Sequence, residues 1–259
     1  MIRSIDIETM LYRWSPRDTA ESWDNVGLLV GNPQQEVRRI LVALDVVPKV
    51  VQEAIDGGYD TIVAHHPVMN CRWQPVQTLR EDSLQGRLLR CLIRHDLSVI
   101  CMHTNLDAAA GGVNDLLAQR LGLSAREILD ESSGMGRVGN LERTLNHAEF
   151  LQRVKERLSP NGLRYVEGTQ PICRVAVGGG SCGDFLHLAV ERGCQAFVTA
   201  DVKYNQFLTA KEQGILLVDA GHFPTEDVVC PEIVLRLREA FPTISVEKST
   251  SHQEVIQYL

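Results

Sequence analysis

The segment RRILVALDVVPKVVQEAIDGGYDTIVAHHP, residues 38–67, decides the fold of this chain. The apolar run at 38–45 predicts a buried strand. Residues 48–58 predict a helix, because proline stands at its first position and glycine just beyond its end. The run at 60–66 predicts a second strand. The segment therefore indicates a strand–helix–strand unit of a parallel α/β sheet.

The same alternation continues along the rest of the chain. The hydrophobic pattern predicts a helix over 82–96, a strand over 97–103 and a helix over 112–122. Further on, it predicts a strand over 215–221 and a helix over 225–241. This order of elements is typical of the α/β class.

The second half of the chain resembles the first. Residues 39–66 align with 174–201 without a gap, and apolar positions mostly meet apolar positions. Identity is low and all such units share this periodicity, so chance similarity is the alternative to an internal duplication. If the duplication holds, Asp201 takes the place of His66. We expect two similar α/β/α layered domains.

The boundary between the domains is predicted where the pattern becomes less regular, at 124–171. The stretch ESSGMGRVGN, residues 131–140, is rich in turn-forming residues. We therefore predict an N-terminal domain of residues 1–125 and a C-terminal domain of residues 126–259, although a single intertwined unit is also compatible with the pattern.

Composition narrows the class of protein. The 259 residues carry a net charge of −7, which disfavours a general nucleic-acid binder because such proteins are usually basic. No apolar run approaches the roughly 18 residues of a membrane span. The N-terminal stretch MIRSIDIETML has acidic residues where a signal peptide needs an unbroken apolar core. We expect no membrane partner and no secretion.

The cysteines also indicate a protein that is not secreted. The chain has seven of them, and no two have the spacing C-x-x-C, so a disulfide framework and a zinc ribbon are disfavoured. We expect most of them to be small buried residues in a reducing, cytoplasmic environment. They are Cys71, Cys91, Cys101, Cys173, Cys182, Cys194 and Cys230.

Titratable side chains gather in four segments at predicted strand ends or helix starts. In open α/β sheets, sites form outside the carboxyl ends of the strands, so these segments can converge although they are far apart in the sequence. The segments are AHHP (64–67), MHTNLDAAAGG (102–112), TADVKYN (199–205) and AGHFPTE (220–226).

The residue types in these segments indicate a metal site. His65 and His66 end one strand, and a strand end that turns lets both rings reach one place. Taken alone, Asp107 could be a turn or cap residue, and Glu226, four residues after His222, could complement a helix dipole. Together, imidazoles and carboxylates without a thiolate suit Zn, Mn, Fe, Ni or Co. This many donors suits two ions rather than one.

A competing interpretation concerns the stretch GGGSCG at 178–183. It fits G-x-G-x-x-G, with Asp201 about 20 residues further on, which is the outline of a dinucleotide-binding turn. A milder version is a helix start that binds a phosphate. Both indications are weak, since glycine-rich turns are common between strand and helix.

The ordered set of motifs resembles the NIF-three-like family, which includes YbgI-like proteins, many of them labelled GTP cyclohydrolase I type 2 homologues. The motifs are ESWDNVGLLVG (21–31), AHHP, HTNLD, TADVKY and GHFPTE, and the resemblance runs from about Ile5 to the C-terminus. It implies a two-domain α/β fold with a dinuclear metal site and a toroidal homo-hexamer. The chain resembles the compact members, which lack a long middle insertion.

The resemblance also implies roles for individual residues. The metal ligands are expected to be His65, His66, Asp107, His222 and Glu226, the last bridging both ions. His103 is expected beside them, either as a group that supports the ligands or as a proton carrier, and is the candidate catalytic residue. Asn205 and the pair Phe223-Pro224 depart from some relatives, which leaves the substrate contacts open.

The sequence thus predicts a metal-dependent hydrolase that acts on a nucleotide, as the cyclohydrolase label implies. The candidate substrate-binding residues are Asp24, Asn25, Asp201 and Lys203. One alternative is a metal-binding interaction or storage protein without catalysis. Another is a nucleotide-binding protein that uses the turn at 178–183.

Overall fold

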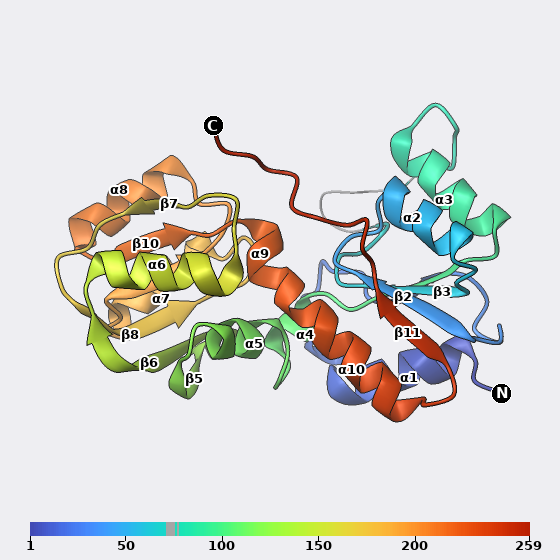
Figure 1. Ribbon diagram of the computed structural model, residues 1–259, viewed down its shortest axis with the longest axis horizontal. Helices are drawn as coiled ribbons and strands as arrows, with labels where there is room; N and C mark the ends of the chain where they lie inside the picture. Colours follow the sequence, from blue (N-terminus) through green and yellow to red (C-terminus); the bar gives the residue numbers. More distant parts are fainter. Residues whose placement is uncertain (71–75, 77) are drawn as a thin grey trace. The chain divides into compact units, whose positions relative to one another are not determined.

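The structure is a computed structural model that describes residues 1–70, 76 and 78–259, and the chain divides into two compact units (Figure 1). Unit 1 comprises Met1–Ala109 and Val229–Gln253. Unit 2 comprises Ala110–Val228 and Glu254–Leu259. Each unit has its own sheet with helices packed on it, so the predicted α/β class with two similar layered domains is confirmed.

Unit 1 is built on a five-stranded sheet with the order β1–β4–β3–β2–β11. β1 runs antiparallel to β4, and the other neighbouring pairs are parallel. The strands are β1 (Gly27–Val30), β2 (Arg39–Ala43), β3 (Thr61–Ala64), β4 (Ser98–Cys101) and β11 (Ser245–Lys248). The helices are α1 (Ser4–Trp14), η1 (Arg17–Thr19), α2 (Pro48–Asp56), α3 (Leu84–Arg94), α4 (Thr104–Ala108) and α10 (Cys230–Ala240).

The segment that decides the fold forms β2, α2 and β3, as its pattern predicts. α2 starts with Pro48 in its first turn and ends at Gly57. One buried cluster joins Val50 of α2, Leu89 of α3 and Ile62 of β3, so these two helices cover one face of the sheet. The three central strands end together, because Ala43 pairs with Ala64 and Ala64 pairs with Cys101.

The chain returns to unit 1 after residue 228. The predicted boundary at 125/126 instead assigns all residues after 125 to one C-terminal domain. α10 contacts β2, and β11 then pairs with β2 in parallel, with Lys248 opposite Val42. The predicted C-terminal domain of residues 126–259 therefore differs from the compact units. The physical reason is that β11 completes the sheet of unit 1 by long-range pairing, which hydrophobic periodicity does not report.

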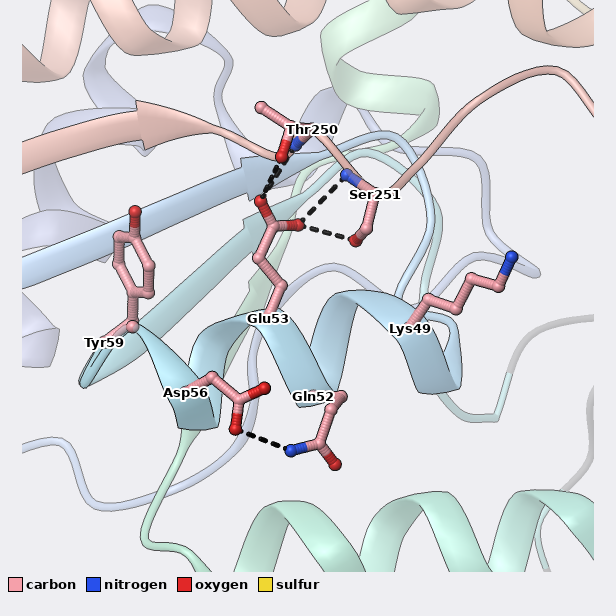
Figure 2. Close-up of a pocket in the computed structure, with 8 residues that line it drawn as sticks. Lys49, Gln52, Glu53, Asp56, Tyr59, Thr250 and Ser251 are labelled. Carbon is pink, nitrogen blue, oxygen red and sulfur yellow. Dashed lines mark hydrogen bonds between the residues drawn. The ribbon is translucent and has the colours of Figure 1, made fainter.

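Residues 249–252, which we name the C-terminal strap, follow β11 and lie against α2. The Glu53 carboxylate accepts five hydrogen bonds from them: from the hydroxyls of Ser249, Thr250 and Ser251 and from the backbone N–H groups of Thr250 and Ser251. Figure 2 shows Glu53 on α2 reaching Thr250 and Ser251.

Unit 2 is built on a six-stranded sheet with the order β5–β6–β8–β9–β10–β7. β8, β9 and β10 are parallel, and β5, β6 and β7 are antiparallel to their neighbours. The strands are β5 (Ser124–Asp130), β6 (Met135–Leu145), β7 (Arg164–Val166), β8 (Ile172–Val177), β9 (Ala196–Thr199) and β10 (Leu216–Asp219). The helices are α5 (Val113–Arg120), α6 (His147–Leu158), η2 (Gly183–Phe185), α7 (Leu186–Glu191), α8 (Tyr204–Gln213) and α9 (His222–Glu226), and η3 (Asp227–Val229) leads into α10.

The stretch at 124–171, whose sequence pattern is irregular, folds into β5, β6, α6 and β7. β6 is not recognised as a strand from its sequence, because it carries two glycines and a buried arginine. Arg137 is only 4% exposed, and its Nε donates to Asp115 Oδ1 at 2.7 Å. A charged residue inside a strand contradicts the alternation on which sequence reading depends, and here the ion pair makes its burial possible.

The two aligned segments of the sequence have the same pairing in space. Ile40 lies opposite Thr61 in unit 1, and Val175 lies opposite Ala196 in unit 2, which are the same positions of the alignment. The α2 helix of unit 1 corresponds to η2 followed by α7. Each unit therefore contains the same strand–helix–strand element in the same register.

None of the six described cysteines forms a disulfide. Three are buried and three partly buried, and Cys71 lies outside the described residues. In the part of the chain that the structure describes, no helix has both the length and the apolar character needed to span a membrane.

We predict that Glu53→Gln destabilises the protein at neutral pH and not in acid. Burial raises the pKa of the Glu53 carboxyl, but the hydrogen bonds from Ser249, Ser251 and Thr250 outweigh it and lower the pKa to about 2. A depressed pKa stabilises the fold above the unfolded value of about 4.3, and this stability disappears as the pH falls toward 2.

The expected loss at pH 7 is about 1–2 kcal/mol, because the site is partly exposed. The difference in urea unfolding free energy between wild type and Glu53→Gln should shrink on going from pH 7 to pH 3. Asp56→Asn is the control, since it removes a carboxylate of the same helix that bonds to Gln52 (Figure 2). A difference independent of pH would contradict the prediction.

Candidate metal centre

Three histidines of unit 1 lie together at the carboxyl ends of β3 and β4. His65 and His66 follow β3 directly, and His103 follows β4. The ring centroids are 4.9 Å apart for His65 and His66, 5.1 Å for His65 and His103, and 5.5 Å for His66 and His103. One nitrogen from each ring lies within 4.8 Å of the others, so the three could hold a metal ion. Parallel pairing of the two strands is what brings them together.

The rings of His65 and His66 are each fixed through Nδ1. The His65 Nδ1–H donates to the carbonyl oxygen of Met102 at 2.8 Å. The His66 Nδ1–H donates to Asp45 Oδ1 at 2.7 Å. Because carbonyl and carboxylate oxygens only accept, Nδ1 carries the proton and Nε2 keeps the lone pair that binds a metal.

Asp45, the acceptor for His66, stands just after β2. Burial raises the pKa of its carboxyl, but hydrogen bonds from His252 and His66 outweigh this and hold the pKa well below its usual range. The group therefore stays ionised at neutral pH. An ionised acceptor on Nδ1 makes Nε2 a stronger electron donor.

His103 is fixed in the same way by Asp24. The His103 Nδ1–H donates to Asp24 Oδ1 at 2.9 Å, while Asp24 Oδ2 accepts from the N–H and the hydroxyl of Thr104 at 3.0 and 2.5 Å. Burial raises the pKa of Asp24, but the bonds from His103 and Thr104 lower it to about 2. Asp24 thus orients His103 and the start of α4.

Asp107 brings a carboxylate to the same cluster. It lies in α4, one turn after His103, and its backbone N–H donates to the His103 carbonyl oxygen at 3.0 Å. Its Oδ1 lies 3.5 Å from His65 Nε2. An imidazole and a carboxylate this close offer two ligand atoms of the types that divalent transition metals prefer.

Unit 2 carries a second donor pair, His222 and Glu226, at the two ends of α9. The His222 Nδ1–H donates to Asp201 Oδ2 at 2.6 Å, and His222 Nε2 lies 2.9 Å from Glu226 Oε2. Burial lowers the pKa of His222, but the charge of Glu226 and the bonds to both carboxylates raise it to about 11. At neutral pH, His222 therefore carries a proton on Nε2 as well, and this N–H faces Glu226 Oε2.

The glycine-rich turn at 178–183 lies beside this pair. Gly180 has φ +61°, and a Cβ there would lie 2.0 Å from Glu226 Oε1 and 3.1 Å from His222 Nε2. The N–H of Gly179 donates to Asn114 Oδ1 at 2.9 Å, and that of Gly180 to Thr225 Oγ1 at 3.1 Å. These amides are bonded to side chains of unit 2, which favours a role in packing around Glu226 over a phosphate-binding role.

A family profile described as Duf34/NIF3 (NGG1p interacting factor 3) matches residues 2–254. The chain belongs to the NIF3 family. The resemblance of its motifs to the NIF-three-like proteins is therefore confirmed.

Known NIF3 relatives match most of the chain. A Clostridium perfringens protein named GTP cyclohydrolase 1 type 2 homolog is 32% identical over 240 residues, or 90% of each chain. A Streptomyces coelicolor protein of the same name is 36% identical over 237 residues, 87% of this chain and 82% of that one. The solved structure of hypothetical protein SA1388 from Staphylococcus aureus has a TM-score of 0.90 and 32% identity and covers 99% of both chains.

Three of the four predicted substrate-binding residues of this NIF3 protein are bonded to groups of the chain itself. Asp24 holds His103 and Asp201 holds His222. Asn25 donates from Nδ2 to the Met69 carbonyl oxygen at 2.8 Å.

Lys203 is exposed, and its ammonium lies 4.0 Å from Asp184 Oδ1. An exposed pair of this kind contributes little, so the side chain can reach a ligand. Substrate contact stays a prediction for all four predicted residues.

The sequence pattern does not identify two residues that support His66. Asp45 ends the apolar run at 38–45, and its place at a strand end is a signal that could have found it. His252, whose Nε2 lies 3.2 Å from Asp45 Oδ2, gives no such signal, because its position depends on the pairing of β11 with β2.

We predict that Gly180→Ala costs more stability than Gly193→Ala in the metal-free protein. Both glycines have left-handed backbones, with φ +61° and φ +69°, but a Cβ at Gly193 meets no heavy atom within 4 Å. Gly193→Ala should therefore cost about 1 kcal/mol from backbone strain alone. Gly180→Ala must also displace Glu226 and should cost about 2–4 kcal/mol.

Urea unfolding measures both changes, and only Gly180→Ala should also lower metal content. Equal losses of stability in the two variants would show that the turn can yield without moving Glu226.

Proposed function

We propose that this NIF3 protein binds divalent metal ions and uses them to hydrolyse a nucleotide. One observation carries the proposal: the three imidazoles among the proposed ligands each have Nδ1 bonded to an acceptor oxygen, which makes Nε2 the nitrogen available to a metal. This arrangement is the one by which proteins orient metal-ligating histidines. The three are His65, His66 and His222, and the ring of His103 is held in the same way by Asp24.

The proposed ligands are the five donors that the family resemblance implies. Unit 1 supplies His65, His66 and Asp107, and unit 2 supplies His222 and Glu226. The set contains three imidazoles and two carboxylates, so the residues fit Zn, Mn, Fe, Co or Ni. We propose two ions per chain.

When bound, such ions lower the pKa of water and polarise a substrate. The chain's own contribution is proton transfer and positioning. His103 is held by Asp24 through Nδ1, so its Nε2 can take a proton from a reacting group and return it. Asp24 stays ionised at neutral pH and keeps the ring in this orientation.

The substrate class follows from the names of the relatives. Two of them are named GTP cyclohydrolase 1 type 2 homolog, so we propose a guanine nucleotide opened by hydrolysis at C8 of its purine ring. The exposed Lys203 ammonium could meet a phosphate group. We also propose a cytoplasmic location and a homo-hexamer, for which light scattering should give six times the chain mass.

The alternative is a metal-binding interaction or storage protein. The family description, NGG1p interacting factor 3, favours this alternative. The two differ in one measurement, since an enzyme loses turnover when metal is removed, whereas a storage protein gives its ions up readily.

Metal analysis is the first test. Protein stripped with a chelator and reloaded should bind about two ions per chain, and His66→Ala should bind fewer. His187→Ala is the control, because it removes an exposed imidazole of unit 2 that bonds to the Asp184 carbonyl oxygen. A wild-type chain that binds none of the five metals would end the proposal.

His103→Ala should keep most of the metal and lose most of the turnover of GTP. Loss of a general acid–base group lowers kcat by about 10²–10⁴-fold. The assay is a screen of GTP with each ion, with metal content measured on the same samples. If His103→Ala loses the metal, His103 is itself a ligand, and if no ion supports turnover in wild type, the storage alternative takes precedence.

A further inference from the structure

We propose that the C-terminal strap, residues 249–252, is a positioning element that orients the metal ligand His66 through Asp45. The inference rests on the proposed metal site and adds to it two residues, Asp45 and His252, that bind no ion themselves.

The contact runs from His252 through one carboxylate to His66. Asp45 Oδ1 accepts from His66 Nδ1 at 2.7 Å, and Asp45 Oδ2 lies 3.2 Å from His252 Nε2. Each oxygen thus has its own imidazole. The side chains of His66 and His252 are only 14% and 10% exposed, whereas that of Asp45 is 38% exposed, so both imidazoles are largely shielded from water and the carboxylate is partly open to it.

Strand pairing delivers these residues to one edge of the sheet. The Ser249 N–H donates to the Val42 carbonyl oxygen at 2.7 Å, which extends the pairing of β11 with β2. The His66 N–H donates to the Leu44 carbonyl oxygen at 2.9 Å, which extends the pairing of β3 with β2. The strap and His66 therefore lie on the two sides of the chain that carries Asp45.

Glu53 fixes the strap at this edge. Its carboxylate accepts the five hydrogen bonds from residues 249–251. These bonds fix the backbone position from which the next residue, His252, begins. Figure 2 shows Thr250 and Ser251 bonded to Glu53 over α2. Asp45 and Glu53 belong to the loop before α2 and to α2 itself, so both ends of the strap are held by one short piece of chain.

The physical effect is to keep the Asp45 carboxylate from rotating. With Oδ2 held by His252, Oδ1 stays in the plane where it accepts from His66 Nδ1, and His66 Nε2 keeps one direction. Partners of this kind typically change metal affinity 10–100-fold. By linkage, an ion on His66 must stabilise the docked strap by the same factor.

A merely structural anchor for the chain end is the competing explanation, and a double-mutant cycle distinguishes the two. Affinity for Zn²⁺ is measured on the full chain by competition with a chromophoric chelator. Asp45→Asn should weaken binding about 10-fold, and His252→Ala about threefold or more. The double variant should match Asp45→Asn alone, because His252 acts only through Asp45.

Conservative and matched variants separate positioning from folding. His252→Gln keeps an N–H donor and should restore most of the affinity that His252→Ala loses. Glu53→Gln should weaken Zn²⁺ binding, whereas Asp56→Asn on the same helix should not. Thermal unfolding of each variant shows whether the fold is intact.

If the strap strengthens Zn²⁺ binding, then Zn²⁺ binding must in turn stabilise the strap. A merely structural anchor would show no such effect. Zn²⁺ should slow amide hydrogen exchange of residues 249–252 in wild type and less in Asp45→Asn. Wild-type affinity in His252→Ala, or additive losses in the double variant, would overturn the inference while leaving the proposed function. A wild-type chain that binds none of Zn, Mn, Fe, Co and Ni would end both.

Discussion

The parallel pairing of β4, β3, β2 and β11 is the constraint on which the rest of unit 1 depends. In parallel strands the carboxyl ends meet at one edge, and here four such ends deliver His103, His65 with His66, Asp45 and His252. No loop in the sequence could gather these residues by itself. The carboxyl edge of this sheet therefore carries both the ends of the parallel strands and the candidate metal-binding side chains of unit 1.

Each unit has the same arrangement of side chains within itself. A histidine near the helix after a strand has Nδ1 bonded to an aspartate, and a carboxylate follows four residues later: His103 with Asp107, and His222 with Glu226. The tethers, rather than the ligands alone, fix which nitrogen is presented. Asp24 and Asp201 lie far from their histidines in the sequence, so the sequence alone does not show that they bond to His103 and His222. For this reason both are predicted as substrate contacts.

The fold was largely predictable from the sequence, whereas the residues that hold the candidate metal donors in place were not. Local periodicity reports β2, α2 and β3, and strand-end position reports His65 and His66. It does not report β6, whose buried Arg137 depends on Asp115, or the return of β11 to β2. Ion pairs and long-range ladders are cooperative properties of the folded chain, so single-residue pattern cannot contain them.

The return of β11 to β2 also has a consequence for the order of synthesis. Residues 110–228, which form unit 2 apart from Glu254–Leu259, are inserted within the sequence of unit 1, so the ribosome makes them before the last strand of unit 1. Domains generally fold as they emerge, and pairing over so long a sequence separation is slow. Until β11 and the strap have been made, β2 has an open edge and Asp45 lacks His252. The sheet of unit 1, and with it the support that His66 receives through Asp45, is therefore completed only after residues 245–252 have been made.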